Sequence, residues 1–220
     1  MKNSESAAQS PPAPKPARRR NKRGEGGRLR EDIVTAAAEL LDEAGDEHAV
    51  TLRSVARRVG IAAPSIYPHF PDQPAIMLAV VQREFAALEG LLRSALEQAG
   101  DDPRRRLRAV CDAYLDFARS HPERYRTMFA GVWVPALEGS SLTEEDMAAL
   151  GSETLDLLSG ALGECVAAGA AESDDVPADA TALWVGLHGL AHQRGVSPSF
   201  RWPPDIADRI ITALARLKDA

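Results

Sequence analysis

The sequence predicts an all-α protein. Hydrophobic residues make up 45% of its 220 residues and aromatic residues only 5%, and the abundant alanine and leucine favour helix over strand. Apolar residues recur at helical spacing in one segment after another, and no stretch shows the alternation typical of a strand. Proline and glycine residues separate these segments, so we expect a series of distinct helices.

The first two helices have clear boundary signals. Apolar residues at helical spacing begin at Leu29 and end at Gly45, a residue suited to the left-handed position after a helix. The next helix is expected to start at Thr51, a good N-cap residue with Ser54 as a weak partner three positions on, and to end at Gly60.

A third, short helix is expected from about Ala63 to His69. Pro64 fits its first turn, and Pro68 limits it to about two turns. The segment Thr51–Phe70 thus consists of two short helices around a glycine turn, closed by an aromatic–histidine–aromatic sequence. A DNA-reading helix-turn-helix needs this arrangement, because one helix crosses the DNA backbone and the next enters the major groove.

The rest of the chain is predicted to be a larger helical part. A long fourth helix with a continuous apolar stripe is expected from Gln73 to Gly100. The later helices are expected from Pro103 to His121, from Glu123 to Phe129, from a capping box of Ser141 and Glu144 to Gly169, from Pro177 to Gly195, and from Pro203 to Leu217. The predicted domains are residues 1–26, 27–72 and 73–220.

Charge is unevenly distributed along the chain. Residues 1–30 hold nine Lys and Arg against two Glu, a net +7, so residues 31–220 hold −13 of the total of −6. Residues 1–26 are rich in Pro, Ala, Ser, Lys and Arg without a hydrophobic period, which predicts a disordered basic arm. Its Arg18–Arg23 cluster is expected to bind an anionic polymer with non-specific, salt-dependent affinity.

Several classes of function are disfavoured by the sequence. No apolar run is long enough to cross a bilayer, and the charged amino end lacks the apolar segment of a secretory signal. Cys111 and Cys165 lie far apart, so we expect ordinary buried thiols in a cytoplasmic protein. We find no glycine-rich phosphate loop, nucleophile elbow or metal-ligand cluster, which argues against an enzyme and against a bound cofactor.

A set of apolar, glycine and aromatic residues at fixed spacing carries a family resemblance: Ile33, Ala36, Ala37, Leu40, Gly45, Thr51, Val55, Ala56, Val59, Gly60, Ile61, Ile66, Tyr67, His69 and Phe70. Through them, residues 28–92 resemble the DNA-binding domain of TetR-type transcriptional regulators. The second half is similar to the WHG subtype of C-terminal domain, through Trp184, His188, Gly189 and the segment HPERYRTMF.

The resemblance implies an N-terminal three-helix helix-turn-helix head, joined by the long fourth helix to a helical ligand-binding and dimerisation bundle. It implies a homodimeric repressor that a small molecule releases from a palindromic DNA operator, with the last two helices as the dimer seam. The implied DNA-binding residues are Arg28, Arg30, Thr51, Arg53, Ala63, Pro64, Ser65, Tyr67, His69 and Gln73.

Two positions depart from the family pattern. Ala62 stands where the family often has Ser or Thr, and Gln73 stands where it commonly has Lys. This chain therefore lacks a hydroxyl and a positive charge at two sites of expected phosphate contact. Arg28 and Arg30 at the start of the first helix are expected to compensate by reaching the DNA backbone or minor groove.

The implied ligand pocket consists of apolar and amphipathic side chains: Phe85, Tyr114, Phe117, Tyr125, Met128, Phe129, Trp133, Met147, Trp184 and His188. Trp184 and His188 share a helix face, which fits the core, a pocket wall or the dimer seam. His188 and His192 have the spacing of metal ligands, but no third ligand is evident, so a packed or pocket-lining histidine is preferred. Two alternatives stay open: a small-molecule binding protein or enzyme with a vestigial head, and a DNA-binding regulator without a ligand.

Overall fold

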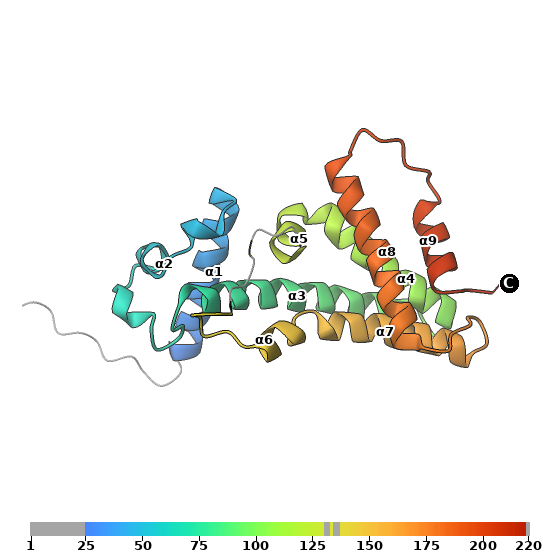
Figure 1. Ribbon diagram of the computed structural model, residues 1–220, viewed down its shortest axis with the longest axis horizontal. Helices are drawn as coiled ribbons and strands as arrows, with labels where there is room; N and C mark the ends of the chain where they lie inside the picture. Colours follow the sequence, from blue (N-terminus) through green and yellow to red (C-terminus); the bar gives the residue numbers. More distant parts are fainter. Residues whose placement is uncertain (1–24, 130–132, 134–136, 219–220) are drawn as a thin grey trace, which may run out of the picture.

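The computed structural model describes residues 25–129, 133 and 137–218, and these form an elongated, almost entirely helical molecule (Figure 1). The predicted basic arm, apart from its last two residues, lies outside the described residues. The all-α fold class is confirmed: the described residues contain α-helices, two short 3₁₀ helices and a single isolated β-bridge. None of the described helices is long and apolar enough to span a membrane.

The head at one end of the molecule contains α1 (Glu25–Ala44), η1 (Glu47–Ala49), α2 (Leu52–Val59), η2 (Ala63–Ser65) and the start of α3 (Gln73–Gln98). These elements enclose a small hydrophobic core of their own. Large buried side chains in this core come from α1, α2, the segment after η2, and α3, among them Ile33, Val55, Ile66, Phe70, Ile76 and Met77. The amino-terminal part of α3 therefore belongs structurally to the head.

Local signals fix the second helix as expected. The Thr51 hydroxyl accepts the Ser54 amide at 3.0 Å while the Ser54 hydroxyl accepts the Thr51 amide at 2.8 Å, a reciprocal capping box. Gly60 ends the helix at φ +76°, a left-handed conformation that glycine adopts without strain. The helix-turn-helix begins with α2 and this turn.

The expected third helix is shorter than predicted. Residues Ala63–Ser65 form a single 3₁₀ turn, and Phe70 closes the segment by donating its amide to the Ile66 carbonyl at 3.0 Å. Pro64 and Pro68 lack amide hydrogens and disfavour the α conformation in the residue before each of them. Two prolines in so short a segment thus prevent a regular α-helix, although Ile66 and Phe70 still anchor it in the head core.

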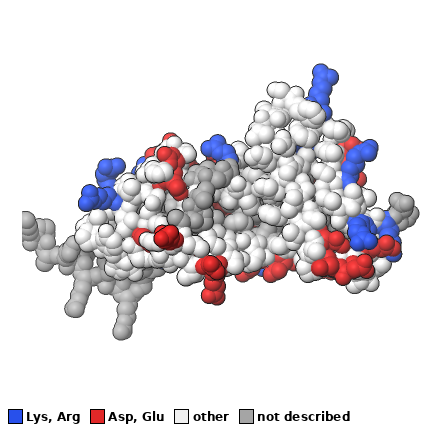
Figure 2. Space-filling view, in the orientation of Figure 1, with Lys and Arg blue, Asp and Glu red and all other residues white. Residues whose placement is uncertain are grey.

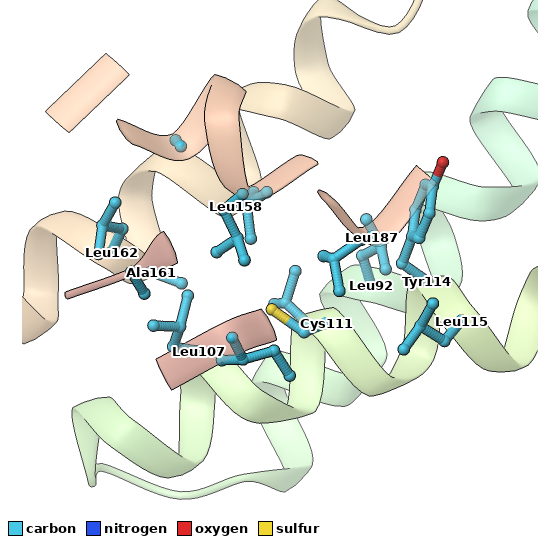
Figure 3. Packing of buried hydrophobic residues seen from close by; sticks show 14 of the residues in the cluster. Leu92, Leu107, Cys111, Tyr114, Leu115, Leu158, Ala161, Leu162 and Leu187 are labelled. Atoms are coloured by element: carbon cyan, nitrogen blue, oxygen red, sulfur yellow. The ribbon is translucent and has the colours of Figure 1, made fainter. Parts of the chain in front are cut away.

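The body is a bundle built around the rest of α3. It contains α4 (Pro103–Ser120), α5 (Pro122–Phe129), α6 (Glu144–Ala149), α7 (Ser152–Ala167), α8 (Val176–Val196) and α9 (Ile206–Leu214). Leucines from α3, α4, α7 and α8 meet in its core, with the buried thiol of Cys111 between them (Figure 3). Both Cys111 and Cys165 are buried free cysteines, and burial raises the pKa of each thiol.

The helix predicted from Ser141 to Gly169 differs from the structure in its continuity and in its start. The long helix predicted from Ser141 to Gly169 is divided into α6 and α7 by Gly151, whose φ is +74°. The N-cap of α6 is Thr143, which forms a capping box with Asp146, and Ser141 instead donates to Asp72 of the head. A left-handed residue cannot continue an α-helix, so the apolar spacing continues while the backbone turns.

The last predicted helix, from Pro203 to Leu217, starts later and ends earlier than expected, since α9 begins at Ile206. The α9 helix stops at Leu214, and Leu217 lies in the isolated antiparallel bridge with Ala171, which follows α7. The amide of Lys218 donates to the Ala170 carbonyl at 3.0 Å. The carboxyl-terminal residues therefore tie α9 back to the end of α7.

A buried carboxylate lies where the head meets the body. Glu84 of α3 is only 4% exposed, and it pairs with its neighbour Arg83 and with Arg124 of α5. The Arg83 guanidinium also donates to the Thr35 hydroxyl of α1 at 3.4 Å. One charge cluster thus connects α1, α3 and α5, as buried charges require paired partners.

Candidate nucleic-acid interface and ligand cavity

The end of the head presents an exposed surface formed by α2 and η2. Tyr67 is 59% exposed, and Pro64 is also exposed, while Ile66 and Phe70 between and beside them are buried. Ser65 is partly exposed. Because Ile66 and Phe70 are buried, they fix the backbone around Tyr67. The Tyr67 ring itself is open to solvent and available to a binding partner.

The N-cap residue Thr51 and the arginines of α2 have different surroundings. Arg53 and Arg57 are exposed, and Thr51 is exposed although its hydroxyl is engaged in the capping box. Arg58 instead forms ion pairs with Glu39 at 3.2 Å and Glu43 at 2.6 Å, both on α1. In Figure 2, one group of basic side chains stands at the head end of the molecule, acidic side chains lie on the head and along the lower edge, and further basic side chains stand at the body end.

The remaining predicted DNA-binding residues lie at the edges of this surface. Arg28 and Arg30 are exposed on the first turns of α1, and the Arg30 guanidinium lies over the Phe70 ring at 4.8 Å from its centroid. The Gln73 side-chain amide donates to the Glu47 carbonyl at 2.9 Å. Gln73 therefore ties α3 to η1, a structural role that the sequence did not indicate. Ala63 and His69 are partly exposed.

The body contains a cavity of about 350 Å³ between α3, α5, the α6–α7 elbow and α8. Aromatic side chains from three helices form one wall, namely Phe85, Phe129 and Trp184. The elbow forms the other wall, with lining residues Ala148, Leu150, Gly151, Ser152, Thr154 and Leu155. A separate small void of about 10 Å³ has Thr154 and Trp184 in common with this cavity and is also lined by Tyr114 and Leu187.

Three polar groups meet beside the aromatic wall. The Tyr125 hydroxyl lies 2.8 Å from His188 Nδ1, and the Tyr114 hydroxyl lies 3.2 Å from the same nitrogen. Burial lowers the pKa of His188, further helped by His192, and burial raises the pKa of both tyrosines. All three groups are therefore neutral at neutral pH, and the ring of Phe129 packs on Tyr125 and His188 at 4.9 Å each.

The structure brings six of the predicted pocket residues together around the cavity and its polar end: Phe85, Tyr114, Tyr125, Phe129, Trp184 and His188. The sequence left open whether Trp184 and His188 belong to the core, a pocket wall or the dimer seam. In the structure Trp184 lines the cavity and His188 lies next to Trp184. Met147 is on α6 but does not line the cavity, and Met128 packs against the body core.

Two predicted pocket residues lie elsewhere. Phe117 is 2% exposed and borders a groove with Leu91 and His121, because three residues beyond Tyr114 a helical side chain is rotated by about 60°. Trp133 packs against the head core and not beside the cavity. The elbow residues were not among the predicted pocket residues, and the one local signal for them was the glycine at position 151.

We expect Gly151→Ala to destabilise the protein and to reshape the cavity. A Cβ atom at this position would lie 2.6 Å from Cε1 of Phe85, and the backbone φ is +74°. The left-handed strain and the overpacking together should cost about 2–4 kcal/mol in chemical denaturation.

The matched control is Gly160→Ala in the middle of α7, where no atom lies within 4 Å of the added Cβ. That change should be neutral or slightly stabilising, because alanine favours helix. Equal effects of the two substitutions would contradict the packing of Gly151 against Phe85.

Comparison with known proteins gives matches along both parts of the chain. The family model for "Bacterial regulatory proteins, tetR family" matches residues 33–80, and the model for "Tetracyclin repressor-like, C-terminal domain" matches residues 107–217. The HTH-type transcriptional activator FasR of Mycolicibacterium smegmatis is 31% identical over 130 residues, which cover 59% of this chain and 58% of FasR. The chain thus spans little more than half the length of that relative.

Solved structures show the same fold. A protein of unknown function from Rhodococcus sp. RHA1 is 26% identical with a TM-score of 0.67, covering 85% of this chain and 91% of that one. FadR of Bacillus subtilis, solved in complex with stearoyl-CoA, has a TM-score of 0.64 at 15% identity, covering 84% of this chain and 97% of FadR. At that low identity the match to FadR shows a similar fold only.

Proposed function

Because the chain belongs to the TetR family of bacterial regulatory proteins, we propose that it is a homodimeric, ligand-responsive repressor of transcription. Its head, residues 27–72 together with the first turns of α3, binds operator DNA, and the rest of the predicted domain 73–220 holds the effector and the dimer seam. The observation that carries the proposal is that α3 has its first turns in the head core, at Ile76 and Met77, and its middle, at Phe85, in the cavity wall. One helix thus connects both sites. The WHG subtype stays a prediction.

The proposed DNA contacts are the exposed residues of the surface formed by α2 and η2 and of its edges. Tyr67, with support from Ser65 and the exposed Arg53, contacts the groove and its phosphates. Two heads related by a two-fold axis require a near-palindromic operator with half-sites on successive turns of DNA. This role places the protein in the cytoplasm.

The proposed dimer seam is formed by α8 and α9. The two helices pack closely, since a Cβ at Gly186 of α8 would lie 2.4 Å from Leu214 and 3.1 Å from Ile210 of α9. Val185, next to Gly186, is 56% exposed and offers an apolar contact to the second copy. Pairing of α8 and α9 with their mates would form a four-helix bundle.

The proposed effector is an uncharged or largely apolar molecule. Among the described residues, those that line the cavity include no Lys, Arg, Asp or Glu, so a buried ionic group would have no counter-charge from them. The neutral Tyr114, Tyr125 and His188 offer one hydrogen-bonding end. The stearoyl-CoA bound to FadR makes a long acyl chain a reasonable first trial ligand. The cavity also favours this function over that of a regulator without a ligand.

We expect Tyr67→Ala to weaken operator binding at least about tenfold, since removal of a DNA-contacting side chain costs about 1–3 kcal/mol in each head. The test is a gel-shift with the intergenic DNA beside the gene. Tyr67 is exposed, so stability should change by less than about 0.5 kcal/mol.

Leu91→Ala is the control, because Leu91 is also an exposed apolar residue, at 44%, but lies on the body. Equal binding by the Tyr67 variant and the wild type, or binding by a variant without residues 51–70, would refute the DNA-binding role. A reporter gene behind the operator then distinguishes a repressor from an activator, which is the action named for FasR.

A further inference from the structure

A hydrogen-bonded clasp joins the head to the segment that leads into the cavity wall. Asp72 lies two residues after Phe70, at the N-cap of α3, where one carboxylate oxygen accepts the Ala75 amide at 2.9 Å. The same oxygen accepts the Ser141 hydroxyl at 3.0 Å, and the other oxygen accepts the Ser141 amide at 2.7 Å. Asp72 therefore does more than cap a helix.

The partner of Asp72 is ten residues away from the elbow of the cavity. Leu142, next to Ser141, is 7% exposed, and Thr143 starts α6 with its capping box. The α6 helix has only six residues and is followed by Leu150 and Gly151, which line the cavity. Ser141 thus lies two residues before the N-cap of α6, and the elbow directly follows the last residue of α6.

We propose that Asp72 and Ser141 are positioning residues that transmit a displacement of the α6–α7 elbow to the DNA-reading segment, which extends from η2 to Phe70. An occupant that pushes Leu150 and Gly151 away from Phe85 shifts α6, and Ser141 then pulls on Asp72 directly beside the reading segment. The inference rests on the proposed function. It adds a second connection between the cavity and the DNA-reading segment, besides α3 itself. Hydrogen bonds to a carboxylate are stronger than neutral ones, which suits them to carry such a displacement.

The chain offers a matched control for Asp72. Asp102 caps α4 in the same way, with its carboxylate accepting the Arg105 amide at 2.8 Å. The described residues show no hydrogen bond from the Asp102 side chain to another element. Asp72→Ser and Asp102→Ser both replace an aspartate cap by another good cap residue, but Asp72→Ser alone removes the clasp.

The experiment combines these substitutions with Gly151→Ala, which displaces the elbow from Phe85 without a ligand. Operator affinity is measured by fluorescence anisotropy in the wild-type, Asp72→Ser and Asp102→Ser backgrounds. Gly151→Ala should weaken binding by about fivefold or more in the wild-type and Asp102→Ser backgrounds. In the Asp72→Ser background its effect should fall below about twofold. Ser141→Ala, which leaves the cap intact, should act in the same direction as Asp72→Ser.

An equal effect of Gly151→Ala in all three backgrounds would overturn the proposal, as would no effect in the wild type. If Gly151→Ala lowers the folded fraction, the experiment uses Leu155→Trp in its place, because this larger side chain on α7 fills the cavity. Hydrogen exchange of the amides of residues 61–73 gives a readout that needs no DNA. Gly151→Ala should increase this exchange only while the clasp is intact, so failure of the clasp is distinguishable from failure of the DNA-binding function.

Discussion

Replacement of Arg18, Arg19, Arg20, Lys22 and Arg23 by glutamine is expected to weaken operator binding by about 100-fold or more at physiological salt. Each cation that neutralises a DNA phosphate releases counterions, and removing one such cation reduces the slope of log affinity against log salt by about 0.9. Residues 31–220 carry a net charge of −13, so we expect the basic arm to supply most of the attraction for DNA. Anisotropy titrations from low to high salt measure both quantities.

The control for the arm is a single cation of the head. Arg53→Gln removes one exposed charge from α2 and should reduce the salt slope by about one in each protomer. Neither variant should change the melting temperature, because the arm precedes α1 and Arg53 is exposed. An unchanged salt slope after replacement of the five arm cations would show that the arm does not contact DNA.

Phe117→Ala is expected to have the largest effect on stability of the predicted pocket residues. The ring is 2% exposed in the body core, with His121 at 5.4 Å and the Arg124 guanidinium also at 5.4 Å from its centroid. Truncation of a buried phenylalanine costs about 3–5 kcal/mol, since transfer and cavity terms add. In a chain of this length, that lowers the melting temperature by about 6–20 °C.

The comparison variant is Phe129→Ala, which truncates a partly exposed ring at the cavity. We expect a smaller loss of stability and a larger change in the binding of a trial acyl ligand, because the cavity wall already borders empty space. Similar melting temperatures for the two variants, or stronger loss of ligand binding in the Phe117 variant, would place Phe117 in the pocket after all.

The fold of the head was predictable because its signals are local. Thr51 with Ser54, Gly60, and the two prolines at 64 and 68 determine where α2 and the reading segment start and stop. Such caps act over three or four residues, so the sequence alone carries them. The prolines also explain the one local error there, since they reduced an expected α-helix to a 3₁₀ turn.

The site was only partly predictable from sequence. The family resemblance implied a pocket of apolar and amphipathic side chains, and six of the ten candidates lie at the cavity or its polar end. The wall that the sequence did not indicate is the elbow at Gly151, because a continuous apolar spacing looks the same whether or not the backbone turns within it. The sequence likewise did not indicate that Arg58 pairs with α1 and that Gln73 binds the Glu47 carbonyl.

The all-α class, the helix-turn-helix head and the concentration of positive charge near the amino end followed from the sequence, since periodicity, caps and charge are properties of neighbouring residues. The three-dimensional arrangement was needed to show that Ser141 binds Asp72, 69 residues away, that Phe117 packs in the core, and that Trp133 packs against the head. The physical reason is that hydrogen-bonding capacity and hydrophobicity belong to a residue, whereas its partner is chosen by the path of the whole chain. The Asp72–Ser141 clasp and the Glu84 charge cluster between head and body are of this second kind.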